Sequence, residues 1–287
     1  MVAPATVGII GVGLMGGSLG KALRQSGRFD KVIGYDSSPE SVERARRTEC
    51  VDEIVPNVHD VAAAADLLIL AAPVGQIVRL IDTVGPSLKP GTIVLDIGST
   101  KSVVAKAMRR LPDTVEAIGG HPMTGPTTVG VGGISAEMFR DRVFVLTPTS
   151  RTSPATLAWC ESTLAGIGAR VVVLDPDRHD RLVALVSHLP RLLPVPLLAT
   201  VLTNGDDVAL RLAAGGFRES TRKATDNIDM WVDIVLSNAD YLTAAATAFT
   251  AQLDRCIATI ATKDESAVRR MLTDAADQWH ERFGDDA

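Results

Sequence analysis

The stretch that decides the fold is VGIIGVGLMGGSLGKAL, residues 7–23. Its apolar start at 7–10 predicts a β-strand, and helical spacing over 17–25 predicts the helix that follows. Between the two lies the pattern GxGxxG, whose glycines let the backbone turn tightly and let a pyrophosphate approach the helix N-terminus. The stretch therefore predicts a dinucleotide-binding loop. The residues expected to contact the cofactor there are Gly11, Gly13, Leu14, Met15 and Gly16.

An acidic residue ends the second predicted strand, 31–35. This residue, Asp36, follows Gly16 by 20 positions. A carboxylate at this place accepts hydrogen bonds from the adenosine ribose hydroxyls and repels a 2′-phosphate. Its neighbours Ser37 and Ser38 supply no compensating cation. We therefore expect NAD and not NADP. A flavin site, a nucleotide-sugar site and a purely structural glycine turn are the alternatives.

Short β-rich runs alternate with helical patterns from residue 6 to about residue 175, which is typical of βα units on a parallel sheet. The expected strands are 7–10, 31–35, 67–71, 93–96, 115–118, 143–147 and 170–174. The remaining segments predict helices at 178–187, 192–203, 206–213, 228–261 and 264–283. The expected fold is α/β: an N-terminal Rossmann-type doubly wound sheet (1–176) followed by an all-helical C-terminal dimerisation domain (177–287).

Composition narrows the class of protein. Of the 287 residues, 46% are hydrophobic and 22% are charged, as in soluble globular proteins. A net charge of -5 does not attract nucleic acid or an anionic membrane. Three widely spaced cysteines indicate neither a disulfide framework nor a metal site and favour the reducing cytoplasm. The apolar tract 192–202 is shorter than the roughly 20 residues of a membrane span, and the N-terminus lacks the features of a signal peptide.

Two polar motifs follow neighbouring strands of the predicted sheet, DIGSTKS (96–102) and GGHPMTG (119–125). Ligands of open α/β sheets bind at the carboxyl ends of the strands, so Ser99 and His121 are both expected to reach the nicotinamide. Pro122 restricts His121 to an extended backbone, and the glycines are expected to leave room for cofactor and substrate. The alternatives are a structural, hydrogen-bonded histidine and a serine that only caps a helix.

The chain resembles the prephenate dehydrogenase family, which also includes arogenate and cyclohexadienyl dehydrogenases. The motifs that carry the resemblance are GVGLMGGSL (11–19), DIGSTK (96–101), GGHPMTG (119–125), HDRLVALVSHLPR (179–191) and GFRESTRKATDNIDMWVDI (216–234). The resemblance implies NAD-dependent oxidative decarboxylation of prephenate to 4-hydroxyphenylpyruvate in tyrosine biosynthesis. Hydride would pass from C4 to NAD+, and loss of CO2 would make the ring aromatic.

The resemblance also implies roles for single residues. His121 matches the catalytic histidine that accepts the proton of the C4 hydroxyl, and its ordinary pKa near 6.5 suits a base at neutral pH. Ser99 matches the serine that links this histidine to the nicotinamide. Arg222 matches the arginine that binds the substrate's carboxylate, for which a guanidinium fork is well suited. The other residues expected at the substrate are His188, Arg191, Trp231, Thr127 and Glu219, of which Glu219 matches a residue that can reach the neighbouring subunit's site.

Two positions depart from the family's pattern. Arg191 stands where many relatives have the second histidine of SHLPH, and Thr127 stands where many have a glutamate. These departures leave arogenate, or both substrates of a cyclohexadienyl dehydrogenase, open as alternatives to prephenate. More distant alternatives are a β-hydroxyacid dehydrogenase or imine reductase and a non-catalytic dinucleotide sensor. We expect a cytoplasmic homodimer joined through the helical domain, without a metal and without nucleic-acid or membrane partners.

Overall fold

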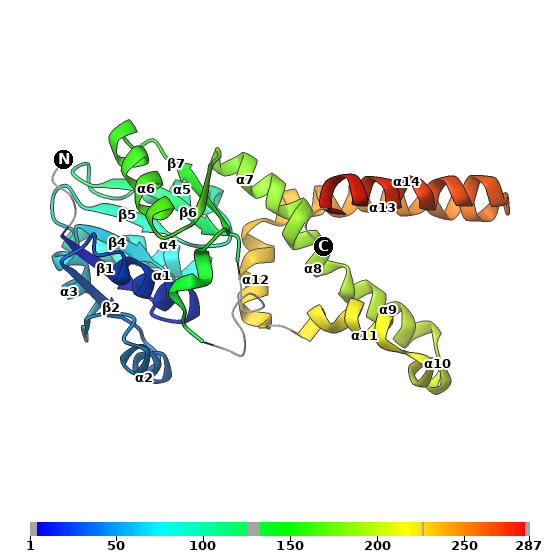
Figure 1. Ribbon diagram of the computed structural model, residues 1–287, viewed down its shortest axis with the longest axis horizontal. Coiled ribbons are helices and arrows are strands. Elements are labelled where there is room, and N and C mark those ends of the chain that lie inside the picture. The colour runs from blue at the N-terminus through cyan, green and yellow to red at the C-terminus, as the bar shows by residue number, and fades with distance from the viewer. Residues whose placement is uncertain (1–4, 125–132, 226, 285–287) are drawn as a thin grey trace. The chain divides into compact units, whose positions relative to one another are not determined.

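The computed structural model describes residues 5–124, 133–225 and 227–284 (Figure 1). Contacts within the chain divide it into two compact units, Met1–Asn238 and Ala239–Ala287. The first unit contains the sheet and the helices up to α12. The second contains α13 (Ala239–Ala261) and α14 (Glu265–Phe283). The domain boundary predicted between residues 176 and 177 lies inside the first unit and stays a prediction.

An eight-stranded sheet forms the centre of the first unit, in the order β3-β2-β1-β4-β5-β6-β7-β8. The strands are β1 (Thr6–Ile10), β2 (Lys31–Tyr35), β3 (Glu53–Ile54), β4 (Leu67–Leu70), β5 (Ile93–Asp96), β6 (Glu116–Pro122), β7 (Val143–Pro148) and β8 (Arg170–Val173). Seven of them lie at the predicted places, and β3 was missed because a two-residue strand shows no periodicity. Strands β1, β4, β5 and β6 are adjacent and parallel, so their carboxyl ends lie side by side at one end of the sheet.

The sequence predicted a parallel sheet, but the sheet is not parallel throughout. Strands β1 to β6 pair in parallel, but β7 pairs antiparallel with β6. Parallel neighbours need a crossover connection, usually a helix. The described part of the connection before β7, residues 133–142, contains only one short 3-10 helix, η4 (Ala136–Phe139), so it provides no such crossover helix.

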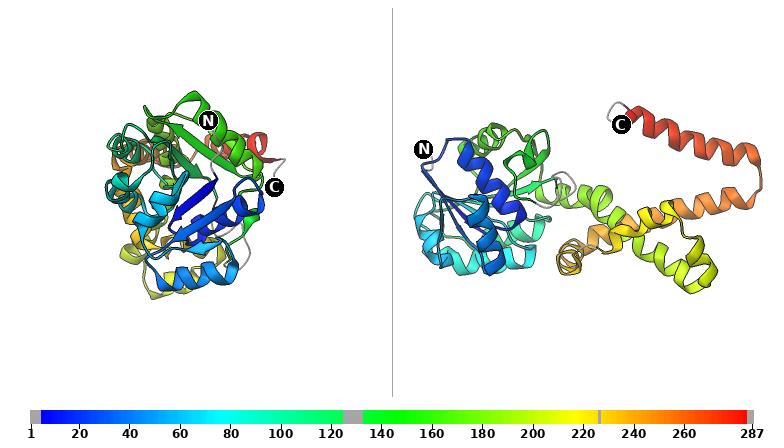
Figure 2. Two further views of the ribbon diagram at one scale, coloured as in Figure 1. Left: turned by 90° about the vertical axis from the view of Figure 1, so that its left-hand side faces the viewer. Right: turned by 60° about the horizontal axis from the view of Figure 1, so that its bottom comes forward.

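Helices cover both faces of the sheet, which confirms the doubly wound architecture (Figures 1 and 2). One face packs against α1 (Leu14–Gln25), α2 (Pro39–Thr48) and α6 (Pro154–Gly166). The other packs against α3 (Val58–Ala64), α4 (Val74–Val84) and α5 (Ser102–Met108). The central strands β1, β4 and β5 are buried on both sides, as expected for strands between two helical layers.

One long helix follows the sheet where the sequence predicted a break between 187 and 192. It starts as α7 (Pro176–Val183), passes through a π-helical turn (Ala184–His188) and continues as α8 (Leu189–Leu192) and α9 (Pro194–Asn204). Pro190 lacks an N–H, and the π turn just before it shifts the hydrogen-bond register, so the helix continues.

This helix is long and apolar enough, by length and composition, to cross a membrane. It also carries the buried polar residues His179, Asp180 and His188. All three side chains form hydrogen bonds with the protein. These hydrogen bonds tie the first half of the helix to the rest of the unit.

The rest of the first unit is formed by α10 (Asp207–Leu212), α11 (Gly215–Arg222) and α12 (Ile228–Ser237). The single helix predicted over 228–261 is interrupted at Asn238. The side chain of Asn238 donates to the carbonyl oxygen of Asp180 (2.9 Å) and lies 3.0 Å from Nδ1 of His188. These long-range contacts end α12, and α13 starts at the next residue.

Candidate active site

The glycine loop at the end of β1 is shaped by close backbone contacts. Gly11 has a φ of 99°, and a Cβ there would lie 2.2 Å from the carbonyl oxygen of Ala71. A Cβ on Gly16 would lie 1.9 Å from the carbonyl oxygen of Gly11. Helix α1 begins just after the loop, and its N-cap, Gly13, offers no side chain to its free N–H groups. The loop thus fits a pyrophosphate at this helix N-terminus.

A cavity of about 380 Å³ opens beside the glycine loop. Asp36 lines it at the end of β2, and the backbone N–H of Ser38 donates to the Asp36 carboxylate (2.9 Å). Gln76 and Arg79 of α4 line the same cavity. A carboxylate beside a glycine loop is the arrangement that binds the ribose hydroxyls of a dinucleotide, so this cavity fits the adenosine half of the cofactor.

His121 lies within strand β6 and not after it, and it pairs with Val145 of β7. The glycines before it lie close to protein atoms, and their predicted role in leaving room for cofactor and substrate stays a prediction. A Cβ on Gly119 would lie 2.2 Å from Oγ1 of Thr147, and a Cβ on Gly120 would lie 2.8 Å from the carbonyl oxygen of Asp96. These glycines therefore make room for the neighbouring strands β5 and β7.

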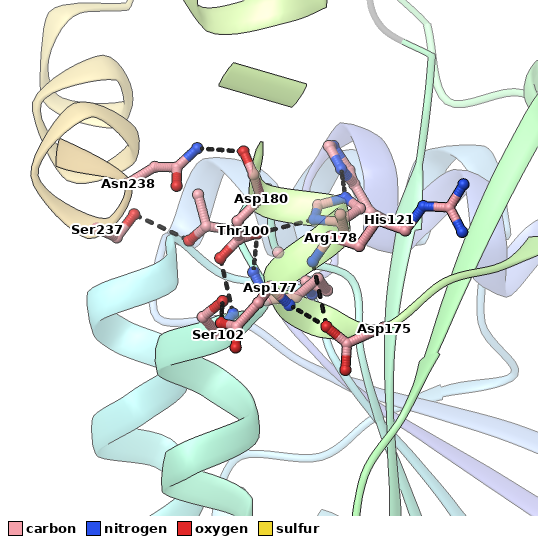
Figure 3. A network of polar contacts seen from close by, with 12 residues as sticks. Thr100, Ser102, His121, Asp175, Asp177, Arg178, Asp180, Ser237 and Asn238 are labelled. Atoms are coloured by element: carbon pink, nitrogen blue, oxygen red, sulfur yellow. Dashed lines mark hydrogen bonds and ion pairs between the residues drawn. The ribbon is translucent and has the colours of Figure 1, made fainter. Parts of the chain in front are cut away.

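A buried chain of hydrogen bonds leads away from His121 (Figure 3). Nδ1 of His121 lies 2.9 Å from Nε2 of His179, and Nδ1 of His179 lies 2.8 Å from Oδ1 of Asp180. The Asp180 carboxylate also accepts from the backbone N–H of Lys101 (2.7 Å) and of Ser102 (2.8 Å). Strand β6, helix α7 and the start of α5 are joined by this chain.

The charges of this chain follow from its surroundings. Burial lowers the pKa of His121 well below 6.5, and nearby His179, Lys101 and His188 lower it further. Burial of Asp180 opposes ionisation, but hydrogen bonds from His179 and from the amides at the start of α5 outweigh it and lower the pKa of this carboxyl. At neutral pH the site therefore holds a neutral His121 and an ionised Asp180.

A buried ion pair lies beneath the same strand. Nζ of Lys101 donates to the carboxylate of Asp96 and to the carbonyl oxygen of Gly120 (2.6 Å). Both charged side chains are fully buried. Since Gly120 precedes His121, Lys101 fixes the backbone that carries the imidazole.

Ser99 follows β5 and is half-buried. It does not cap α5, because that helix starts at Ser102 and the backbone N–H groups at its start donate to the Asp180 carboxylate. Within the described residues, Ser99 and His121 form no direct hydrogen bond. The next residue, Thr100, donates to Oγ of Ser237 (2.9 Å) and so ties this loop to α12.

Three of the predicted substrate residues line a second cavity, of about 310 Å³ and mostly apolar. The rings of His188 and Trp231 meet edge to face with centroids 6.0 Å apart, and Cζ of Arg191 lies 4.9 Å from the Trp231 ring centroid. Burial lowers the pKa of His188 to about 4, although Asp180 acts in the opposite direction. The cavity therefore combines a neutral imidazole, an indole face and the cations Arg191 and Lys223.

The structure does not bring every predicted residue to these cavities. Arg222 and Glu219 are exposed on α11 and line neither of them. Thr127 lies outside the described residues. Sequence reasoning assigned no role to His179, Asp180 or Asn238. The signal for the first two was the adjacent His-Asp pair in HDRLVALVSHLPR, directly after the last strand.

Comparison with known proteins agrees with this arrangement. The model of the prephenate dehydrogenase nucleotide-binding domain matches residues 19–173, and that of the prephenate dehydrogenase dimerization domain matches residues 175–274. A cyclohexadienyl dehydrogenase of Zymomonas mobilis is 31% identical over 262 residues, covering 90% of this chain and 89% of that protein.

Two solved structures are similar over nearly the whole chain. Prephenate dehydrogenase from A. aeolicus, in complex with hydroxyphenyl propionate and NAD+, gives a TM-score of 0.87 at 28% identity, covering 96% of this chain and 97% of that one. Synechocystis arogenate dehydrogenase gives a TM-score of 0.82 at 28% identity, covering 96% and 99%. With both of its parts matched in order and the expected loop and histidine in place, the chain belongs to the prephenate dehydrogenase family.

Proposed function

We propose that this protein is an NAD-dependent prephenate dehydrogenase that forms 4-hydroxyphenylpyruvate and CO2 in tyrosine biosynthesis. The observation that carries the proposal is the position of His121, whose Nδ1 contacts His179, on the same sheet as the glycine loop. NAD+ would accept hydride from C4 of the substrate. The NAD+ and hydroxyphenyl propionate bound by the A. aeolicus enzyme support the choice of cofactor and of a ring-containing substrate.

His121 is the proposed proton acceptor. Its Nδ1 is engaged with His179, so Nε2 is the nitrogen left to meet the C4 hydroxyl. The lowered pKa keeps this nitrogen free of a proton at neutral pH. A positioned base of this kind typically accelerates a reaction by about 10²–10⁴-fold. We propose that Ser99 orients the imidazole and the nicotinamide relative to each other.

The second cavity is the proposed substrate-binding region. Prephenate carries two carboxylates, and Arg191 and Lys223 supply two cations on a mostly apolar wall. Trp231 offers a flat face for the ring, and neutral His188 has one nitrogen left to donate a hydrogen bond. We further propose that Arg222 and Thr127 contact the substrate, and that Glu219 approaches the site of a neighbouring subunit.

NAD is the proposed cofactor because Asp36 lines the first cavity. Its carboxylate suits ribose hydroxyls and repels a 2′-phosphate. We propose that Gly11, Gly13, Leu14, Met15 and Gly16 hold the pyrophosphate.

Arogenate is the alternative substrate, because relatives of similar identity include arogenate and cyclohexadienyl dehydrogenases. Arogenate carries an ammonium on its side chain where prephenate carries a keto group. Arg191 and Lys223 both line the cavity, and two cations would repel that ammonium, so the cavity favours prephenate.

A cytoplasmic homodimer is the proposed assembly, with a domain boundary near residue 176. A stripe of apolar side chains is exposed along one face of α13: Phe249, Leu253, Ile257 and Ile260. The dimerization-domain match supports the pairing of two copies through the helical part.

One comparison of four reactions tests the activity. Purified protein is mixed with NAD+ or NADP+ and with prephenate or arogenate, and the reduced cofactor is followed by absorbance. We expect prephenate with NAD+ to give the highest kcat/KM, by at least about tenfold. Faster oxidation of arogenate would support the alternative. Oxidation of a β-hydroxyacid, with no oxidation of prephenate or arogenate, would refute the proposal. Light scattering of the purified protein would test the dimer separately.

A further inference from the structure

We infer that His179 and Asp180 are positioning residues that keep the proton of His121 on Nδ1 and leave Nε2 bare for the substrate. The inference rests on the proposed role of His121 as base. It assigns a function to two buried residues that line neither cavity.

The direction of the hydrogen bonds follows from what each group is able to donate. An ionised Asp180 only accepts, so the nitrogen 2.8 Å from it, Nδ1 of His179, carries a proton. We take the fully buried His179 ring to carry one proton only, so its other nitrogen, Nε2, is an acceptor. This nitrogen lies 2.9 Å from Nδ1 of His121, which must therefore donate. The reverse order would place two acceptors 2.8 Å apart.

The chain of hydrogen bonds His121–His179–Asp180, called the relay below, is held rigid at Asp180. Backbone N–H groups at the start of α5 donate to both carboxylate oxygens of Asp180, and Asn238 donates to its carbonyl oxygen. A helix N-terminus also favours a negative charge. His179 and Asp180 have exposed fractions of 0% and 1%. The carboxylate is thus fixed in place before any ligand binds.

This arrangement matters at the moment of proton transfer. The O–H bond of the C4 hydroxyl breaks and an N–H bond forms at Nε2 of His121, while Nδ1 keeps its own proton. The new positive charge faces Lys101 and His188 as well as His179, and Asp180 is the anion that offsets it through one intervening ring. A His121 that carried its proton on Nε2 could not accept the substrate's proton.

Steady-state kinetics of variants give the first test. His179→Phe keeps a flat ring but removes the acceptor, and we expect kcat to fall by about 10²-fold or more with KM and the Kd for NADH nearly unchanged. His179→Gln retains an acceptor oxygen and should restore part of kcat. Asp177→Asn is the matched control for Asp180→Asn, because Asp177 is exposed on the same helix and accepts from Oγ of Ser102 (2.6 Å) without contacting a histidine. Asp180→Asn should lower kcat strongly and Asp177→Asn should leave it near wild type.

The second test reads the proton directly. In protein labelled with 15N-histidine, the His121 signals, assigned by their loss in His121→Asn, should show a protonated Nδ1 and a bare Nε2. This preference should disappear in His179→Phe. A folded His179→Phe with wild-type kcat, equal losses in Asp177→Asn and Asp180→Asn, or a proton on Nε2 in the wild type would each overturn the inference.

The spectrum needs no substrate, so it separates this inference from the proposed function. If neither cyclohexadienol is oxidised but the proton sits on Nδ1, the proposed activity fails and the relay stands. If prephenate is oxidised and the proton sits on Nε2, the relay fails alone. If His179→Phe does not fold, the wild-type spectrum and His179→Gln still decide.

Discussion

Asp233 of α12 accepts hydrogen bonds from the backbone N–H of Gly75 on both carboxylate oxygens, at 3.1 and 2.9 Å. Gly75 lies in the first turn of α4, whose own N-cap, Pro73, has no side chain for this purpose. A residue that follows the sheet in sequence thus caps a helix packed on the sheet. Because α12 also carries Trp231, this contact holds the indole in place relative to α4.

Asp233→Ala removes this cap. We expect the free energy of unfolding to fall by about 1 kcal/mol, as for other lost helix caps, and KM for prephenate to rise severalfold because α12 is held less firmly. Urea unfolding and steady-state kinetics measure the two effects. Asp229→Ala, an exposed position on the same helix, is the control, and an equal effect there would contradict the explanation.

His121→Asn tests the proposed base. The amide cannot accept the C4 proton as an imidazole does, so we expect kcat to fall by about 10²–10⁴-fold. The Kd for NADH, measured by fluorescence, should stay within a factor of two to three of wild type. His59→Asn changes an exposed histidine that bonds to Ser87 and should leave both quantities unchanged. Near-normal turnover of His121→Asn would remove this residue from the mechanism.

His188 predicts a dependence of stability on pH. Its pKa is lowered to about 4 in the folded protein, against 6.5 without the fold. Above pH 6.5 both states are neutral at this residue. As the pH falls below 6.5, the unfolded chain binds a proton that the folded one does not, and stability is lost until about pH 4.

When the pH falls from 7.5 to 5, this residue should therefore lower the free energy of unfolding by about 2 kcal/mol. In His188→Asn, which still offers an oxygen to Asn238, that part of the loss should be absent. Urea unfolding of both proteins at the two pH values measures the difference, in which the other titrating groups cancel. Identical losses would show that folding does not lower the pKa of His188.

Asp36→Ser should change the choice of cofactor. Without the carboxylate we expect NADH to bind about tenfold more weakly, since a hydrogen bond to a charged group is lost. NADPH should bind more tightly than in the wild type, because the repulsion is gone and Arg79 lines the same cavity. In Asp36→Ser/Arg79→Gln this gain should vanish. Asp30→Ser, an exposed position, serves as control for both cofactors.

The parts of the structure that are local in sequence were predictable. The glycine loop, Asp36 and the long strands depend on residues close together in the chain, and periodicity and motif spacing report such features directly. The resemblance named His188, Arg191 and Trp231, which line one cavity.

The features that sequence reasoning missed depend on residues far apart. His121 and His179 are 58 residues apart, and the break at Asn238 depends on Asp180 and His188. No local pattern encodes such pairings. The direction of β7 was missed for the same reason, because an apolar strand has the same alternation whether it runs up or down.

The uncapped start of α1 has a consequence for where an anion settles. Helices α1, α4 and α5 all follow strands of one sheet edge, and each has a positive N-terminal end. Asp233 neutralises α4 and Asp180 neutralises α5, whereas the first turn of α1 receives no side-chain cap from Gly13. The N-termini of α4 and α5 are thus occupied by the protein's own carboxylates and are less able to bind another anion. We therefore expect a diphosphate to bind at the N-terminus of α1, and this contact to fix how the rest of the cofactor lies along the sheet.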